Sequence, residues 1–274
     1  MSIHEPFPSL EELLDSMGTA GERIAGMAAS EGSAGNLSLC IAWPIEVRRR
    51  FPVAEPLPLP VAVPALAGAT LLVTGSGRRL REVGSDPEAN LGALRIAADG
   101  RTAVLHTSPR RLFARLTSEL NSHLAVHADR MQADRPNLHA LVHAQPLQLT
   151  LLSHMPAYRE GDTLTRRLLR WEPETLINLP EGVAVLPFML PGSDDLQQAT
   201  LAALRTHQIV VWSKHGVMAR SDHSITRVAD LIEYAETAAR YELLDLSTGG
   251  HAEGLTADDL TRIARAFDVP TTLY

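Results

Sequence analysis

Two histidines follow apolar segments of the sequence, where they could bind a metal ion. His143 closes the run LHALVH, and His215 lies just after the run QIVVW. Both runs are typical of buried strands, and polar side chains at strand ends can meet where a sheet opens into a crevice. Because neutral imidazole is the commonest protein ligand for metals, this pattern suggests that both histidines bind one ion. Taken alone, a histidine at a strand end is more often structural or solvated.

The residue expected beside His143 is a glutamine. Side chains at positions i and i+2 of a strand point to the same face, so the neighbour of His143 on its own face is Gln145. His139 shares that face but lies about 13 Å away at the rise of an extended strand. It is therefore too distant to bind the same ion.

Two carboxylates are candidates for acid–base chemistry. Glu119 lies at the start of an expected helix, where a carboxylate is favourable for capping and dipole reasons, and His123, four residues later, shares its face. This pair is typical of a local hydrogen-bonded support rather than of a second metal site. Glu174 lies in the segment WEPE between a helix and a strand, and most carboxylates in such loops are simply solvated.

Short turns of small residues could bind an anion. The turns are Thr74-Gly75-Ser76-Gly77, Gly35-Asn36 and Thr117-Ser118. Small residues let backbone amides approach a phosphate closely, although each turn is equally consistent with an ordinary loop. The arginines next to the glycine turn, Arg78, Arg79 and Arg81, could add positive charge or could be ordinary surface residues.

Composition excludes several classes of protein. The 274 residues carry 25 basic and 32 acidic side chains, so the formal net charge is −7 and no basic face for nucleic acid is expected. A single cysteine, Cys40, rules out an intrachain disulfide and leaves metal binding to histidine and carboxylate. The N-terminus lacks a signal pattern, and five prolines interrupt the apolar stretch from Phe51 to Leu72. We therefore expect a cytoplasmic protein without a membrane span, in which this stretch is an extended surface segment or a sheet edge.

Hydrophobic periodicity predicts an α/β protein with a mixed sheet flanked by helices. Asp99-Gly100 between two apolar runs is a hairpin signal, and Ser9 with Glu12 resembles a capping box. Strands are predicted at 36–43, 69–74, 91–97, 102–106, 138–143, 182–186 and 208–212. Helices are predicted at 10–30 with a break near Gly18, at 120–131, after Pro146, and at 165–171, 194–207, 225–246 and 256–267.

Taken in order, these segments resemble the rhamnulose-1-phosphate aldolases, a branch of the class II aldolase/adducin superfamily. The resemblance covers nearly the whole chain. It is carried by GNLS at 35–38, LLVTGSGRRLREVGSDPEANLGALRIAADG at 71–100, TSEL at 117–120 with His123, His143, PEGVAVLPFMLPGSDDLQQAT at 180–200, and VVWSKHGVMA at 210–219. The TGSG block and its DPEANLG continuation are specific to this branch, whereas SEL and HGV are shared by the wider superfamily.

The resemblance implies a function and a site. It implies a single three-layer domain over residues 1–274, with a mainly antiparallel sheet, in a homotetramer whose sites lie at subunit interfaces. Three histidines of the family hold zinc, which chelates dihydroxyacetone phosphate, and the matching positions are His143, Gln145 and His215. Glu119 matches the glutamate beside the metal and Glu174 the glutamate that moves the aldehyde proton. The substrate phosphate would lie against Gly35, Asn36, Ser76, Gly77, Thr117 and Ser118.

This sequence departs from the family at one ligand, because Gln145 stands where the family has a second histidine. An amide oxygen is a weaker zinc ligand than imidazole, so we expect weaker zinc binding, a harder ion such as manganese or magnesium, or an empty site. Two alternatives follow: a phosphosugar epimerase or dehydratase of the same superfamily, or a non-catalytic adducin-like protein. Tyr274, the last residue, is expected to be a frayed terminus.

Overall fold

The computed structural model describes residues 3–274 and contains one nine-stranded sheet in this range. The strand order is β2-β5-β4-β3-β1-β6-β9-β8-β7. Every neighbouring pair is antiparallel except β7 and β8, which are parallel. The strands are β1 Asn36–Ile41, β2 Val53–Pro58, β3 Thr70–Thr74, β4 Leu91–Ile96, β5 Thr102–Thr107, β6 Leu138–Ala144, β7 Ala184–Leu186, β8 Ile209–Trp212 and β9 Gly216–Ser221.

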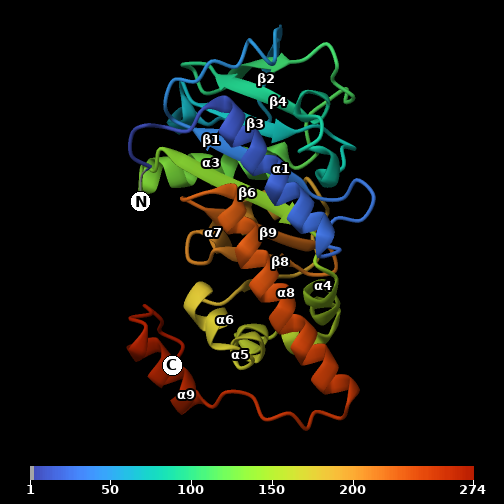
Figure 1. Cartoon of the computed structure of the whole chain (residues 1–274), viewed down its shortest axis with the longest axis vertical. Coiled ribbons are helices and arrows are strands. Elements are labelled where there is room, and N and C mark those ends of the chain that lie inside the picture. The colour runs from blue at the N-terminus through green and yellow to red at the C-terminus, as the bar shows by residue number, and fades with distance from the viewer. Residues whose placement is uncertain (1–2) are drawn as a thin grey trace.

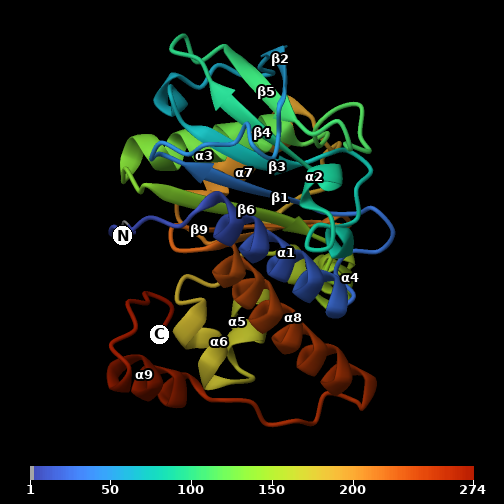
Figure 2. The same ribbon diagram turned by 45° about the horizontal axis from the view of Figure 1, so that its top comes forward.

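Helices cover both faces of the sheet, which gives three layers (Figure 1). Figure 2 shows α1 and α8 side by side in front of the sheet, with α3 and α7 behind it. The α-helices are α1 Leu10–Gly26, α2 Pro87–Asn90, α3 Leu120–Ala133, α4 Leu147–His154, α5 Thr163–Leu169, α6 Pro173–Asn178, α7 Asp194–Leu204, α8 Ile225–Ser247 and α9 Ala257–Ala266. Short 3-10 turns lie at Pro64–Leu66, Leu80–Glu82 and Pro156–Arg159. The predicted three-layer α/β fold with a mainly antiparallel sheet is confirmed.

The first helix is continuous, so the expected break near Gly18 was wrong. The helix begins with the predicted capping box, in which Ser9 and Glu12 satisfy each other's backbone N–H groups. Gly18 is needed for close packing, because a Cβ there would lie 2.5 Å from Cα of Gly84. A Cβ at Gly21 would lie 2.4 Å from the carbonyl oxygen of Leu80. Both glycines therefore let α1 approach the loop that follows the glycine turn.

The proline-rich stretch supplies the edge of the sheet, as predicted. Strand β2 carries Pro56 and Pro58 and pairs on one side only, with β5. Proline is tolerated there because an edge strand leaves one row of N–H groups without a ladder partner. Strand β9 was not predicted, since its sequence GVMARS ends in polar residues, yet all six positions are buried.

Helices α5, α6 and α9 lie at one end of the molecule. Helices α5 and α6 pack against α8, and α9 packs against α6, below the sheet in Figure 1. Within residues 3–274, every helix is too short or too polar to cross a membrane.

Candidate functional site

The sheet register brings four distant segments to one end of the sheet. Asn36, the first residue of β1, is opposite His143 near the end of β6. His143 is opposite Met218 of β9, so His215, just before β9, lies at this same end. The glycine turn follows β3, whose last residue Thr74 accepts a hydrogen bond from the N–H of Leu37 at 3.1 Å. Alternating strand directions thus gather the predicted site residues.

His143 and His215, together with Glu119 at the start of α3, form a cluster with the donor atoms of a metal site. Nε2 of His143 lies 3.8 Å from Oε2 of Glu119, and Nε2 of His215 lies 3.8 Å from Oε1 of the same carboxylate. One ligand atom from each residue lies within 4.8 Å of the other two. Glu119 and His143 are buried, while the His215 side chain is 13% exposed. The cluster is therefore enclosed but open to solvent on the His215 side.

The orientation of His143 leaves one nitrogen free for a ligand. Its Nδ1 lies 2.8 Å from the carbonyl oxygen of Val217, which only accepts, so Nδ1 carries the proton. In the neutral ring Nε2 is then the nitrogen without a proton, and it faces Glu119. A second hydrogen bond that fixes the tautomer in this way is typical of metal-binding histidines.

Aromatic packing holds the two imidazoles together. The rings of His143 and His215 have centroids 4.9 Å apart. Trp212, at the end of β8, packs against both rings at 4.8 and 5.1 Å, and its Nε1 donates to Thr200 at 2.9 Å. Trp212 was not predicted as a site residue, although its position shortly before Lys214-His215-Gly216 was a usable signal.

Gln145 lies next to the cluster. A Cβ placed on Gly216 would come within 3.1 Å of Gln145 Cγ and 3.2 Å of His143 Cε1. The glutamine side chain is half-buried, and its backbone N–H donates to the carbonyl oxygen of Ala29 at 2.8 Å. The donor set of two imidazoles and one carboxylate suits a divalent ion with an open coordination position.

Opposing effects act on the charge of Glu119. Burial disfavours its ionised form, but the imidazole of His143 and the Asn36 amide, whose Nδ2 donates to Oε2 at 2.7 Å, hold the pKa of Glu119 below its ordinary value. Burial and the neighbouring His143 lower the pKa of His215 to about 4. At neutral pH the site thus contains a carboxylate base and a neutral imidazole, which is the metal-binding form.

The predicted phosphate-binding turns lie side by side. The N–H of Thr117 donates to Thr74 O at 3.1 Å, and the N–H of Ser76 donates to Arg115 O at 2.9 Å. Gly77 has a φ of +73°, a left-handed conformation that favours glycine. Ser118 is exposed and Ser76 half-buried, so their hydroxyl groups are accessible to a ligand.

Gly35 and Asn36 approach the cluster from β1. Gly35 has a φ of +84°, and a Cβ there would lie 2.8 Å from the carbonyl oxygen of His143. The Asn36 side chain is already engaged, since Nδ2 donates to Glu119 and Oδ1 lies 2.5 Å from Nε2 of His123. Its predicted role against the phosphate would thus have to involve its remaining N–H groups.

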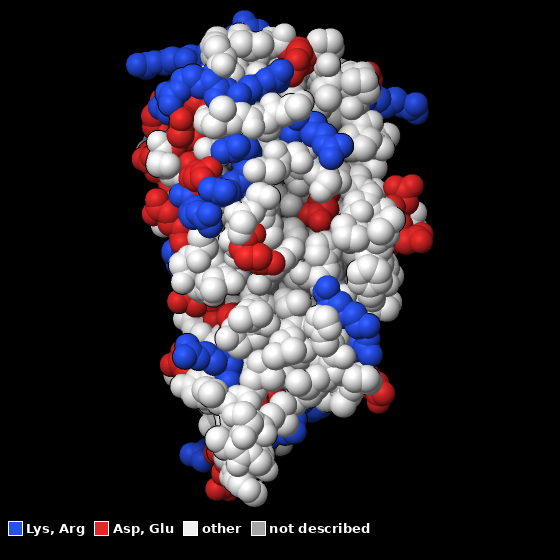
Figure 3. All heavy atoms as spheres, turned by 90° about the vertical axis from the view of Figure 1, so that its right-hand side faces the viewer, with Lys and Arg blue, Asp and Glu red and all other residues white. Residues whose placement is uncertain are grey.

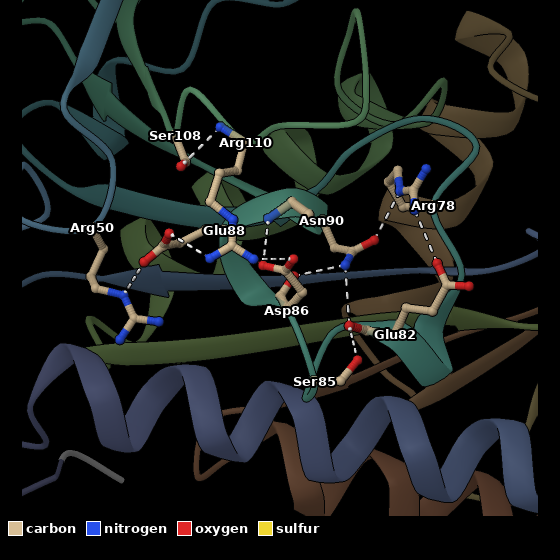
Figure 4. Close-up of polar contacts among 10 residues, drawn as sticks. Arg50, Arg78, Glu82, Ser85, Asp86, Glu88, Asn90, Ser108 and Arg110 are labelled. Atoms are coloured by element: carbon tan, nitrogen blue, oxygen red, sulfur yellow. Dashed lines mark hydrogen bonds and ion pairs between the residues drawn. The ribbon is translucent and has the colours of Figure 1, made fainter.

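The arginines after the glycine turn have internal partners. Arg78 donates to Asn90 Oδ1 at 2.8 Å and pairs with Glu82 at 3.0 Å (Figure 4). Arg79 pairs with Glu82 at 3.3 Å, whereas Arg81 is exposed. Asn90 also donates to the carbonyl oxygens of Glu82 and Asp86. This network stabilises the loop between β3 and β4. Arg78 therefore supports the glycine turn through its internal hydrogen bonds and does not point its guanidinium at the phosphate-binding side.

Glu174 lies apart from the cluster. It is exposed in the first turn of α6, a short helix where a loop was expected, and this helix packs against α8 and α9. Its backbone carbonyl accepts a hydrogen bond from Asn178. Among the described residues of one chain, the metal-type cluster contains Glu119, His143 and His215 without Glu174.

Comparison with known families gives a match over most of the chain. Residues 16–243 match the model of the Class II Aldolase and Adducin N-terminal domain. A rhamnulose-1-phosphate aldolase of Bacteroides thetaiotaomicron is 28% identical over 271 residues, which cover 98% of this chain and 99% of the relative. A rhamnulose-1-phosphate aldolase of Klebsiella pneumoniae is 33% identical over 207 residues, covering 76% and 74% of the two chains.

Solved structures share the same fold. A sugar-phosphate aldolase from Thermotoga maritima superposes with a TM-score of 0.74 at 27% identity, over 88% of this chain and 97% of that one. An L-fuculose 1-phosphate aldolase superposes with a TM-score of 0.59 at 17% identity, over 97% and 100% of the two chains. The second likeness concerns the fold alone.

Proposed function

The chain belongs to the class II aldolase and adducin family, and we propose that it is a metal-dependent aldolase that cleaves a ketose 1-phosphate such as rhamnulose 1-phosphate. The observation that carries the proposal is the enclosed cluster of Glu119, His143 and His215 beside the glycine turn. A carboxylate base, two imidazoles and an anion-binding turn are the groups that cleavage of a phosphorylated ketose requires. The products would be dihydroxyacetone phosphate and an aldehyde.

His143 and His215 would hold the divalent ion, with Gln145 as a weaker third ligand. Zinc is the proposed ion, and manganese or magnesium would suit an amide oxygen better. When bound, such an ion supplies a Lewis acid that stabilises negative charge developing on the substrate oxygens.

The protein's own groups would bind the substrate and move protons. The phosphate would lie against Ser76, Gly77 and the Thr117-Ser118 segment, with Gly35 and Asn36 beside them. As the bond between C3 and C4 breaks, the C4 hydroxyl would lose its proton to Glu174 and become the aldehyde. Glu119, having taken up a proton from solvent, would give it to C3 and return to the carboxylate. In the reverse direction Glu119 removes that proton, which requires a carboxylate within hydrogen-bond reach of the carbon.

Glu174 of a neighbouring subunit would accept the proton of the C4 hydroxyl. Its exposed position on α6, outside the cluster of its own chain, supports this arrangement. We therefore propose a homotetramer with sites at subunit interfaces. In a mixing experiment, Glu119→Gln and Glu174→Gln subunits are separately inactive, and reassembly from a mixture should restore activity. A mixture that stays as inactive as its components would contradict a shared site.

The surface supports a small-molecule substrate. On the face drawn in Figure 3, basic side chains are interspersed with acidic ones and do not form a continuous basic surface. Nucleic-acid binding needs a continuous basic surface, so this face is not suited to bind nucleic acid. A cytoplasmic location is part of the proposal, in keeping with the sugar-phosphate substrate.

The decisive experiment is retro-aldol turnover of rhamnulose 1-phosphate by the zinc-incubated protein, compared with its Glu119→Gln variant. We expect the wild-type protein to turn over rhamnulose 1-phosphate about 10²–10⁴ times faster than the variant, which is the contribution of a general base. Equal rates would overturn the proposal. A panel of other phosphosugars separates cleavage from epimerisation or dehydration. Metal analysis after zinc incubation tests the non-catalytic alternative, which predicts no bound ion.

A further inference from the structure

A chain of buried polar side chains runs from Glu119 into the layer between the sheet and α3. Asn36 and Ser38 come from β1, His123 and His127 from α3, and His139 from β6. Asn36 is 6% exposed and the other four are fully buried. The contacts are Glu119 Oε2 to Asn36 Nδ2 at 2.7 Å, Asn36 Oδ1 to His123 Nε2 at 2.5 Å, His123 Nδ1 to Ser38 Oγ at 2.6 Å, Ser38 Oγ to His127 Nε2 at 2.7 Å, and His127 Nδ1 to His139 Nδ1 at 2.7 Å.

Every proton in this chain can be assigned from the Glu119 end. Since the Asn36 NH2 group donates to the carboxylate, its Oδ1 faces His123 and accepts the proton of Nε2. A neutral imidazole has one N–H, so Nδ1 of His123 accepts from the Ser38 hydroxyl. Ser38 Oγ then accepts from Nε2 of His127.

The assignment continues to His139. Nδ1 of His127 is unprotonated and accepts from Nδ1 of His139. Burial supports neutral rings at this end of the chain: it lowers the pKa of His127 well below its ordinary value and that of His139 to about 3. All five hydrogen bonds therefore point the same way, towards Glu119.

The chain is suited to orientation rather than to proton conduction. A relay would have to pass each proton through Asn36, and an amide nitrogen neither gains nor loses a proton readily. An asparagine amide can, however, adopt two orientations, because a 180° rotation exchanges the positions of its NH2 group and its oxygen. In the turned-over state two oxygens would face each other at Glu119, and two N–H donors would face each other at His123.

We propose that Ser38, His123, His127 and His139 are positioning residues that lock the Asn36 amide with its NH2 group on Glu119. Each member fixes the proton of the next, so the orientation of the catalytic carboxylate depends on residues that touch no substrate. The inference rests on the proposed role of Glu119 as the catalytic base.

The first test removes the hydroxyl at the centre of the chain. Ser38→Ala deletes the donor to His123 and the acceptor of His127 without leaving a large cavity. We expect kcat for rhamnulose 1-phosphate cleavage to fall roughly tenfold, a fraction of the contribution of a general base, with KM nearly unchanged. The matched control is Ser122→Ala: Ser122 is equally buried, and its hydroxyl has no hydrogen-bond partner among the described residues. Equal kcat values for the two variants would overturn the proposal.

A second test uses rescue at His127. In His127→Gln the amide Nε2 retains a donor for Ser38, whereas His127→Leu fills the space without one. We expect the glutamine variant to recover most of the kcat that the leucine variant loses. Equal kcat values for the two variants, with both folded by circular dichroism, would show that the hydrogen bond of His127 has no positioning role.

The third test reads the protons directly and does not depend on activity. Nitrogen-15 spectra of the histidine-labelled protein report which ring nitrogen carries the proton. The expected tautomers are Nε2–H for His123 and His127 and Nδ1–H for His139, and the opposite tautomer at His127 would overturn the inference. If wild-type protein cleaves no phosphosugar while these tautomers are found, the proposed function is wrong, but the assigned hydrogen-bond chain is correct. If wild-type protein is active but Ser38→Ala matches its control, only the inference fails.

Discussion

Nδ1 of His143 donates to the carbonyl oxygen of Val217 at 2.8 Å, and this single contact turns Nε2 towards Glu119. Nε2 of His143 therefore points into the buried cluster, and Nε2 of His215 points to the same carboxylate. In the proposed ligand set, Gln145 takes the place of a third imidazole. Metal affinity should thus respond to this one residue.

Gln145→His should strengthen zinc binding. Imidazole nitrogen is a better zinc ligand than an amide oxygen, and since changes beyond the ligands already alter affinity about 10–100-fold, we expect a gain of at least about tenfold. Competition with a chromophoric chelator measures it. The control is Gln148→His, the same substitution three residues further on. A Gln145→His variant with unchanged affinity would place residue 145 outside the ligand set.

Gly75→Ala should disturb the glycine turn. A Cβ at Gly75 would lie 2.2 Å from the Phe113 ring, and overpacking of this kind costs about 1–3 kcal/mol. Chemical denaturation should show that loss in the free energy of unfolding, together with a higher KM. Gly26→Ala is the control, because a Cβ there meets nothing within 4 Å. Equal stability of the two variants would contradict the packing argument.

Arg78→Ala should lower stability more than it weakens phosphate binding. Arg78 bonds to Asn90 and Glu82 within its own loop and to the carbonyl oxygen of Leu112 in the loop after β5. Removing a partly buried charged donor costs about 1–2 kcal/mol after allowance for solvent screening. Thermal unfolding and KM should be measured alongside Arg81→Ala, whose side chain is exposed. A large rise in KM with unchanged stability would instead place Arg78 at the phosphate.

Glu236 should make the protein less stable as pH rises. Its carboxylate on α8 accepts hydrogen bonds from the N–H groups of Gln148 and Leu149 at 2.9 Å each, at the start of α4. Burial nevertheless raises the pKa of Glu236 above its ordinary value. The folded state then binds more protons than the unfolded state above the unfolded pKa of 4.5. Its contribution is fully present below that pH and is lost as pH rises through the folded pKa.

Glu236→Gln removes this titration while keeping an oxygen acceptor for α4. Denaturation midpoints between pH 4 and pH 8 should show a smaller decline with pH in the variant than in wild type. Glu253→Gln, at an exposed carboxylate, controls for the change in net charge. Parallel pH profiles for wild type and Glu236→Gln would contradict the assignment.

Local sequence determined most of the elements. Alternation and turn residues predicted the hairpin of β4 and β5, and the capping box predicted the start of α1, because these signals depend on neighbouring residues. Strand β9 and the continuity of α1 through Gly18 were not predictable in this way. The polar residues of β9 are buried by the rest of the fold. Gly18 stays within α1 because the helix packs closely against Gly84.

The candidate site divides along the same line. Sequence alone supplied the residue types, since His143, His215, Glu119 and the glycine turn could each be named as candidates. Only the tertiary structure decided that Glu119 lies 3.8 Å from both imidazoles and that Trp212 packs on both. It also showed that Arg78 faces inward and that Glu174 lies outside the cluster of its own chain. The physical reason is that strand pairing, which joins residues as distant as Asn36 and His143, is set by the packing of the whole sheet.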